Sequence, residues 1–129
     1  MDTQLMNNSD LHSEQHTQWN AKLKSLRSEI NDFQERLGEM VTKRTDKDFL
    51  IELAELENNC IIHKEKINKL QDQIKTNDLG FLRQHATNSE LKEASADDIM
   101  SVINDRVATE ISLFGELKNH FEDFEKRYI

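Results

Sequence analysis

The chain has no proline, only three glycines and a single cysteine among its 129 residues. Proline breaks a helix and glycine weakens one, so their scarcity lets helices run long. One cysteine, Cys60, excludes an intrachain disulfide and with it the class of small secreted domains that disulfides hold together. The scarcity of proline and glycine favours a helical protein, and the single cysteine favours a location in the cytoplasm.

Long hydrophobic runs and a surplus of basic charge are also missing. No apolar run approaches the roughly 20 residues that cross a bilayer, and residues 1–8 lack the basic start and apolar centre of a signal peptide. The formal charge of −8 argues against nucleic acid and against anionic membrane surfaces as partners. We therefore expect a cytoplasmic protein whose partners are proteins.

What the chain does have is apolar residues spaced alternately by four and three. This spacing keeps one stripe of a helix against a partner helix, as in a coiled-coil seam. Three seams can be traced: His12, His16, Trp19, Leu23, Leu26, Ile30, Phe33, Leu37 and Met40; Phe49, Leu53, Leu56, Cys60, His63, Ile67, Leu70 and Ile74; and Met100, Ile103, Val107, Glu110 or Ile111, Phe114, Leu117, Phe121, Phe124 and Tyr128.

These seams predict an all-α fold, an elongated antiparallel three-helix bundle with coiled-coil-like heptad seams. We expect a disordered segment at 1–8 and one domain at 9–129, with helices at about 9–42, 46–86 and 96–128. Thr45 is the expected cap of the second helix, and a break of that helix at Gly80 stays open. Apolar residues beside the seams leave open whether a second copy completes the bundle: Leu11, Leu50, Ile61, Ile62 and Leu113.

Two histidines on the first seam suggest a metal site. His12 and His16 are four residues apart, so both rings lie on one face of a helix. If the third helix folds back through residues 91–95, Glu110 falls near Thr76 in the same layer. His12, His16 and Glu110 are thus candidate ligands for iron or zinc in a bundle of hemerythrin or ferritin character. The alternative is a polar layer without metal that fixes helix register.

Short motifs resemble small uncharacterised helical-bundle proteins from Bacteroidetes. The resemblance covers Glu14-Gln15-His16-Thr17-Gln18-Trp19 with Glu29-Ile30, the stretch from Asn58-Asn59 to Leu70, and Phe114 to Phe124. It implies a helical bundle, and the family brings no established activity. Its members carry further histidines where this chain has Asp72 and Asn77.

No catalytic constellation emerges from the sequence. Cys60 lies in a seam and reads as a small core residue rather than a nucleophile, and there is no phosphate loop or nucleophile elbow. The sequence therefore predicts a non-enzymatic bundle without a cofactor. We expect it to act by helix-mediated association, either with itself or with a protein partner.

Overall fold

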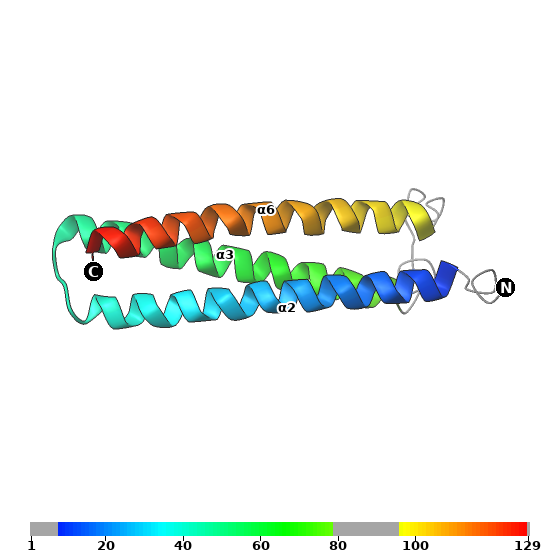
Figure 1. Cartoon of the computed structure of the whole chain (residues 1–129), viewed down its shortest axis with the longest axis horizontal. Coiled ribbons are helices and arrows are strands. Elements are labelled where there is room, and N and C mark those ends of the chain that lie inside the picture. Colours follow the sequence, from blue (N-terminus) through cyan, green and yellow to red (C-terminus); the bar gives the residue numbers. More distant parts are fainter. Residues whose placement is uncertain (1–7, 79–95, 129) are drawn as a thin grey trace.

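The protein is a bundle of three long helices that lie side by side along their lengths (Figure 1). The computed structural model describes residues 8–78 and 96–128, with the side chains of 14–76 and 98–128. The helices are α2 (Asn8–Val41), α3 (Lys47–Asp78) and α6 (Ala96–Tyr128), and the described ranges contain no strand. The predicted all-α three-helix bundle is confirmed.

The helix ends differ from the expected ones in small ways. Asn8 already belongs to α2, and α3 begins at Lys47, so Asp46 rather than Thr45 takes the cap position. The Asp46 carbonyl accepts a hydrogen bond from the Leu50 N–H at 3.1 Å, which closes the first turn. The expected disorder at 1–7, the extension of the second helix over 79–86 and the open question at Gly80 lie outside the described residues.

The connection between α2 and α3 is anchored by Arg44. Its guanidinium binds the Asp46 carboxylate, with Nε 2.9 Å from Oδ1, and lies over the rings of Phe49 and Tyr128 at 5.5 and 4.9 Å from their centroids. The hydrogen bond from Arg44 holds the pKa of Asp46 below its usual value. The connection is therefore tied to the last turn of α6 as well as to α3.

Side-chain bonds between helices define their directions. α3 runs antiparallel to both α2 and α6, and α2 and α6 run parallel, as Figure 1 also shows. The bonds are Arg27 to Asn68 (2.8 Å), Lys64 to Gln34 (3.0 Å), Arg106 to Gln73 (2.9 Å), Arg127 to Glu52 (2.8 Å) and Lys118 to Glu29 (3.4 Å).

The core is a single continuous strip along the bundle axis. Each side chain that it buries contributes about 1.5–3 kcal/mol to folding. Its members recur every three or four residues on all three helices, as the seams predicted: Trp19, Leu23, Leu26, Ile30, Phe33, Leu37, Met40, Phe49, Leu53, Leu56, Cys60, Ile67, Leu70, Ile74, Ile99, Ile103, Val107, Phe114, Leu117, Phe121 and Phe124.

Aromatic rings concentrate in the half of the bundle that holds the α2–α3 connection. Phe33 of α2 stacks on Phe121 of α6 with centroids 4.4 Å apart, and Phe49 of α3 stacks on Phe124 at 5.4 Å. Such pairs add about 0.5–1.5 kcal/mol beyond the area that they bury. Among the described helices, none has both the length and the hydropathy needed to cross a bilayer.

Candidate functional site

Glu110 and His63 form a polar pair inside the bundle. Glu110 is 3% exposed, and its Oε1 lies 2.7 Å from Nδ1 of His63. The imidazole of His63 and the carboxyl group of Glu110 are therefore joined by a direct hydrogen bond. The pair links α3 to α6 and satisfies two groups that would each lower stability if they were buried alone.

This pairing corrects the predicted register of α6. Glu110 was expected near Thr76, and the structure places it beside His63, almost four helical turns away along α3. Arg106 bonds Gln73 and Arg127 bonds Glu52, and both pairs differ from the expected register in the same direction as the pair of Glu110 and His63, by a smaller amount. The turn expected at residues 91–95 lies outside the described part of the chain.

His16 lies in a different layer of the bundle. It is 4% exposed, its ring centroid is 5.7 Å from that of Trp19, and its Nε2 lies 3.1 Å from Sδ of Met100 on α6. Met100 and Glu110 are ten residues apart on one helix, which corresponds to about 15 Å. The structure therefore does not bring His16 and Glu110 together.

The third candidate ligand, His12, belongs to α2, but its side chain lies outside the described part of the structure. Among the side chains of 14–76 and 98–128, no three His, Cys, Asp or Glu residues gather in an arrangement that holds a metal ion. An iron or zinc site that uses His12 and His16 stays a prediction.

Cys60 belongs to α3, and its side chain is fully buried in the core. Burial raises the pKa of its thiol to about 11, and the nearby negative charge of Glu57 adds to the increase. The thiol is therefore protonated at neutral pH, and only the thiolate is a good nucleophile. This environment is that of a small core residue, as the sequence indicated.

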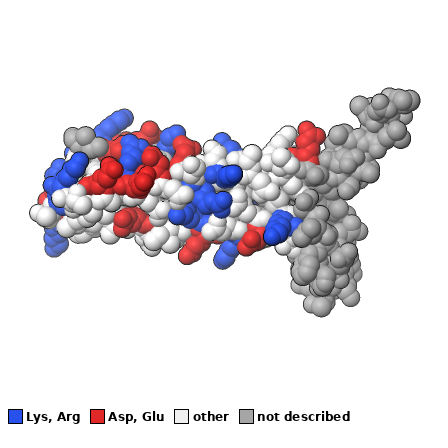
Figure 2. Space-filling model, turned by 90° about the horizontal axis from the view of Figure 1, so that it is seen from below, with Lys and Arg blue, Asp and Glu red and all other residues white. Residues whose placement is uncertain are grey.

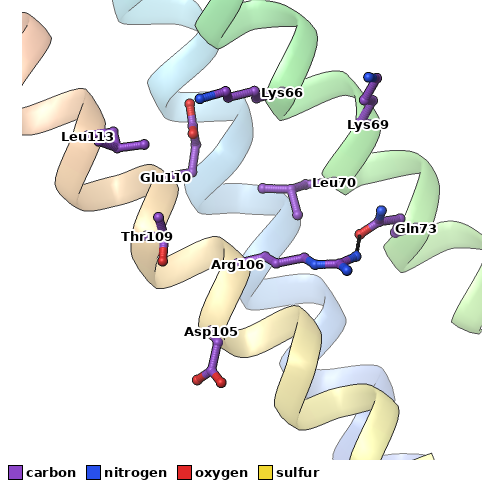
Figure 3. A pocket seen from close by; sticks show the side chains of 9 residues that line it. All are labelled: Lys66, Lys69, Leu70, Gln73, Asp105, Arg106, Thr109, Glu110 and Leu113. Atoms are coloured by element: carbon purple, nitrogen blue, oxygen red, sulfur yellow. Dashed lines mark hydrogen bonds between the residues drawn. The ribbon is translucent and has the colours of Figure 1, made fainter.

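A groove runs between α3 and α6 next to the polar pair (Figure 3). Its volume is about 430 Å³, and Leu70 and Leu113 form part of its wall. Arg106 spans the groove and donates to Oε1 of Gln73 at 2.9 Å. The full lining is Lys66, Lys69, Leu70, Gln73, Asp105, Arg106, Thr109, Glu110 and Leu113. Three basic and two acidic side chains leave the groove close to neutral.

Apolar side chains form a row on the outer side of α3. The core side of this half of α3 carries Phe49, Leu53, Leu56 and Cys60. At about 100° per residue, Ile51, Ala54 and Ile62 fall on the side away from the core, and Leu50 and Ile61 lie at its edge toward α2. The row, which we call the outer row, consists of Leu50, Ile51, Ala54, Ile61 and Ile62, all of them exposed.

The outer row is the largest cluster of exposed apolar residues on one described helix. Ile51 is 51% exposed and Ile61 is 49% exposed, and the remaining large exposed apolar residues, Val41 and Val102, lie on α2 and α6. The sequence had identified Leu50, Ile61 and Ile62 beside the seam but not Ile51 or Ala54. The missing signal was a second three-and-four spacing, 51, 54, 58 and 61, which is apolar except for Asn58 and runs parallel to the seam.

Charged side chains cover the surface unevenly. Figure 2 shows one side of the bundle, on which Asp and Glu gather toward the half that holds the α2–α3 connection, while a basic cluster lies near the middle. Within α3, residues 47–62 carry Asp48, Glu52, Glu55 and Glu57 against Lys47, whereas residues 63–76 carry four lysines against Glu65 and Asp72. The outer row is thus flanked by acidic residues.

Comparison with models of known families, with curated proteins and with solved structures yields no match for this chain.

Proposed function

We propose that this protein is a non-enzymatic helical bundle that acts by helix-mediated association through the outer row of α3. The observation that carries the proposal is the row itself, which presents large apolar side chains at positions where a surface helix normally carries polar ones. Exposed apolar clusters of this kind mark interaction sites on otherwise polar proteins.

The shape of the row supports a helix as the binding element. Ile51, Ala54 and Ile61 lie on one side of α3 with polar Asn58 between them, at intervals of three, four and three residues over about three turns, which is the spacing that packs against another helix. Ala54 and Asn58 lie between the larger side chains at either end. Small residues at this point permit close approach of two helix axes.

A cytoplasmic location is part of the proposal. The one cysteine of the chain is a buried free thiol, in keeping with a reducing compartment. The role needs no bond-making chemistry, because packing against another helix draws only on apolar contact and on the charges that flank the row.

The proposal is tested by replacing both Ile51 and Ile61 with glutamine. These residues are exposed, so the free energy of unfolding should change by less than about 0.5 kcal/mol. Association should weaken at least about tenfold, because two of the largest apolar contacts are lost. The matched control is Val102→Gln on α6, where Val102 is 48% exposed and the substitution should leave association unchanged.

Two measurements read out association. Sedimentation velocity over a wide range of protein concentration reports self-association. Fluorescence anisotropy reports the binding of three synthetic helical peptides that share one leucine stripe and are flanked by lysine, by glutamate or by glutamine. An unmodified protein that stays monomeric and binds none of the peptides contradicts the proposal, and so does a double variant that associates as tightly as the unmodified protein.

A further inference from the structure

The charges along α3 reverse from one half to the other. The acidic half spans residues 47–62 and the basic half residues 63–76. Glu52 is already bound to Arg127 of α6, which leaves Glu55 and Glu57 as the acidic residues flanking the middle of the outer row. A second α3 helix that runs antiparallel would place its basic half over this acidic half.

The two edges of the outer row carry matching pairs of charges. Eleven residues make close to three turns, so Glu55 and Lys66 share the edge nearer α6, where Lys66 also borders the groove. Seven residues make close to two turns, so Glu57 and Lys64 share the edge nearer α2, where Lys64 donates to Gln34 at 3.0 Å. Both pairs are centred on the same point of α3, between Cys60 and Ile61.

A two-fold axis at that point pairs four glutamates with four lysines and lays Glu65 of each copy over polar Asn58 of the other. In an antiparallel pair of helices each edge faces the same edge of the other helix, so Glu55 of one copy meets Lys66 of the other. On the opposite edge Glu57 meets Lys64 in the same way, in exchange for the bond that Lys64 makes to Gln34 within one chain. Ile61 and Ile62 then lie against their own counterparts at the axis, which is the self-complementary arrangement of a two-fold interface.

We infer that the occupant of the outer row is a second copy of this chain, held with the two α3 helices antiparallel about a two-fold axis between residues 60 and 61. This inference rests on the proposed function and specifies its partner. Glu55 and Glu57 of each copy face Lys66 and Lys64 of the other, and the shared centre of both pairs fixes the register.

A competing register is disfavoured by the same charges. Centring the pair near residue 56 would lay Leu50 and Ile51 over Ile61 and Ile62 of the second copy. Glu55 would then approach Glu55 and Glu57 would approach Glu57, and like charges facing each other across an interface oppose association. In the register centred at 60–61, the aliphatic stem of Lys69 covers Ile51 instead.

Charge exchange between two variants tests this register. One variant carries Glu55→Lys and Glu57→Lys, and the other carries Lys64→Glu and Lys66→Glu. Each variant alone faces like charges at four contacts, so its dimer should dissociate at least about tenfold more readily. An equimolar mixture should form a heterodimer at least as tight as the unmodified dimer, because all four contacts then pair opposite charges.

Native mass spectrometry distinguishes the heterodimer from both homodimers by mass, and sedimentation velocity at low and high salt reports the affinities. The control is Lys22→Glu with Lys24→Glu, which makes the same change of net charge at exposed positions on α2 and should leave the dimer intact. Circular dichroism confirms that each variant keeps its helices.

The outcomes separate this inference from the proposed function. A dimer that Ile51→Gln with Ile61→Gln abolishes, but that the charge variants leave unchanged, overturns the register and retains the proposed function. A protein that is always monomeric yet binds a synthetic peptide overturns the second copy as occupant and again retains the proposed function. A protein that does neither overturns both, and a heterodimer that forms only on mixing supports the inference.

Discussion

At the scale of single residues, the most unusual group is the buried carboxylate of Glu110. It occupies a seam position of α6 between Val107 and Phe114, both of which are core residues. Its hydrogen bond with His63 compensates for part of the solvation that burial removes, but a buried polar pair contributes less to stability than to specificity. The pair fixes α6 against α3 because a shifted register would leave both groups unpaired.

Substitutions of Glu110 test how much the free energy of unfolding depends on its hydrogen bond with His63. Glu110→Ala leaves a cavity and an unpaired His63, and we expect the free energy of unfolding to fall by about 2–3 kcal/mol. Glu110→Gln keeps an acceptor oxygen for His63 and should lower it by about 1 kcal/mol. The double variant His63→Leu with Glu110→Leu should recover most of the loss. Urea unfolding followed by circular dichroism measures all three, and an alanine variant as stable as the unmodified protein would refute this role.

Cys60 predicts a loss of stability at high pH. Its thiol has a pKa of about 11 in the folded chain against 9.0 for a free thiol, so between these values the unfolded chain has released a proton that the folded chain retains. Stability from this group is complete below pH 9 and falls as the pH rises toward 11, by at most about 1.4 kcal/mol per pH unit.

The substitution Cys60→Val isolates this contribution. It removes the ionisable thiol and keeps a similar volume, so the decline in stability above pH 9 should become shallower than in the unmodified protein. Urea unfolding at a series of pH values from 8 to 11 provides the comparison. Parallel curves for the two proteins would contradict the assignment.

At the scale of elements, the helices carry two glycines that the fold does not require. A methyl group added at Gly38 or at Gly115 would meet no atom within 4 Å other than those of the adjoining backbone of its own helix. Since alanine is favoured over glycine in a helix interior by about 0.5–1 kcal/mol, each substitution to alanine should raise the free energy of unfolding by that amount. The two effects should add, because Gly38 and Gly115 lie on different helices. A decrease measured by urea unfolding would show a hidden role for either glycine.

The helices and their buried faces could be read from the sequence, because seam spacing depends only on residues within one helix. Leu23, Leu56 and Phe121 are buried for the same local reason. The pairing between helices could not be read in this way. The prediction derived facing positions from an assumed turn between the helices, and it placed Glu110 beside Thr76, whereas Glu110 contacts His63.

The sequence predicted only some of the residues of the candidate site, again because contacts between helices cannot be read from one helix. His16 is buried as its seam position predicted, but its neighbours depend on the register of α6. Ile51 was overlooked because it follows Phe49 and Leu50 in a short apolar run, where the seam accounts for Phe49 alone. The outer row becomes evident only when the solvent side of α3 is considered as a whole.

At the scale of the whole molecule, the described part of the bundle combines a core shared by three helices with the exposed apolar residues of the outer row. The core is formed by residues of all three helices of one chain. The outer row and the charge reversal of α3 are surface features that the core leaves unused. Their coincidence on one helix is what favours an interaction surface over a random scatter of exposed apolar residues.

The central claim is that the outer row of α3 mediates association. Sedimentation equilibrium on the unmodified protein, beside Ile51→Gln with Ile61→Gln, tests it most directly. We predict that the average mass of the unmodified protein rises from 15.2 kDa toward twice that value with increasing concentration, while the variant keeps the mass of one chain. A rise of the same extent in both proteins would show that association does not use the outer row and would contradict the claim.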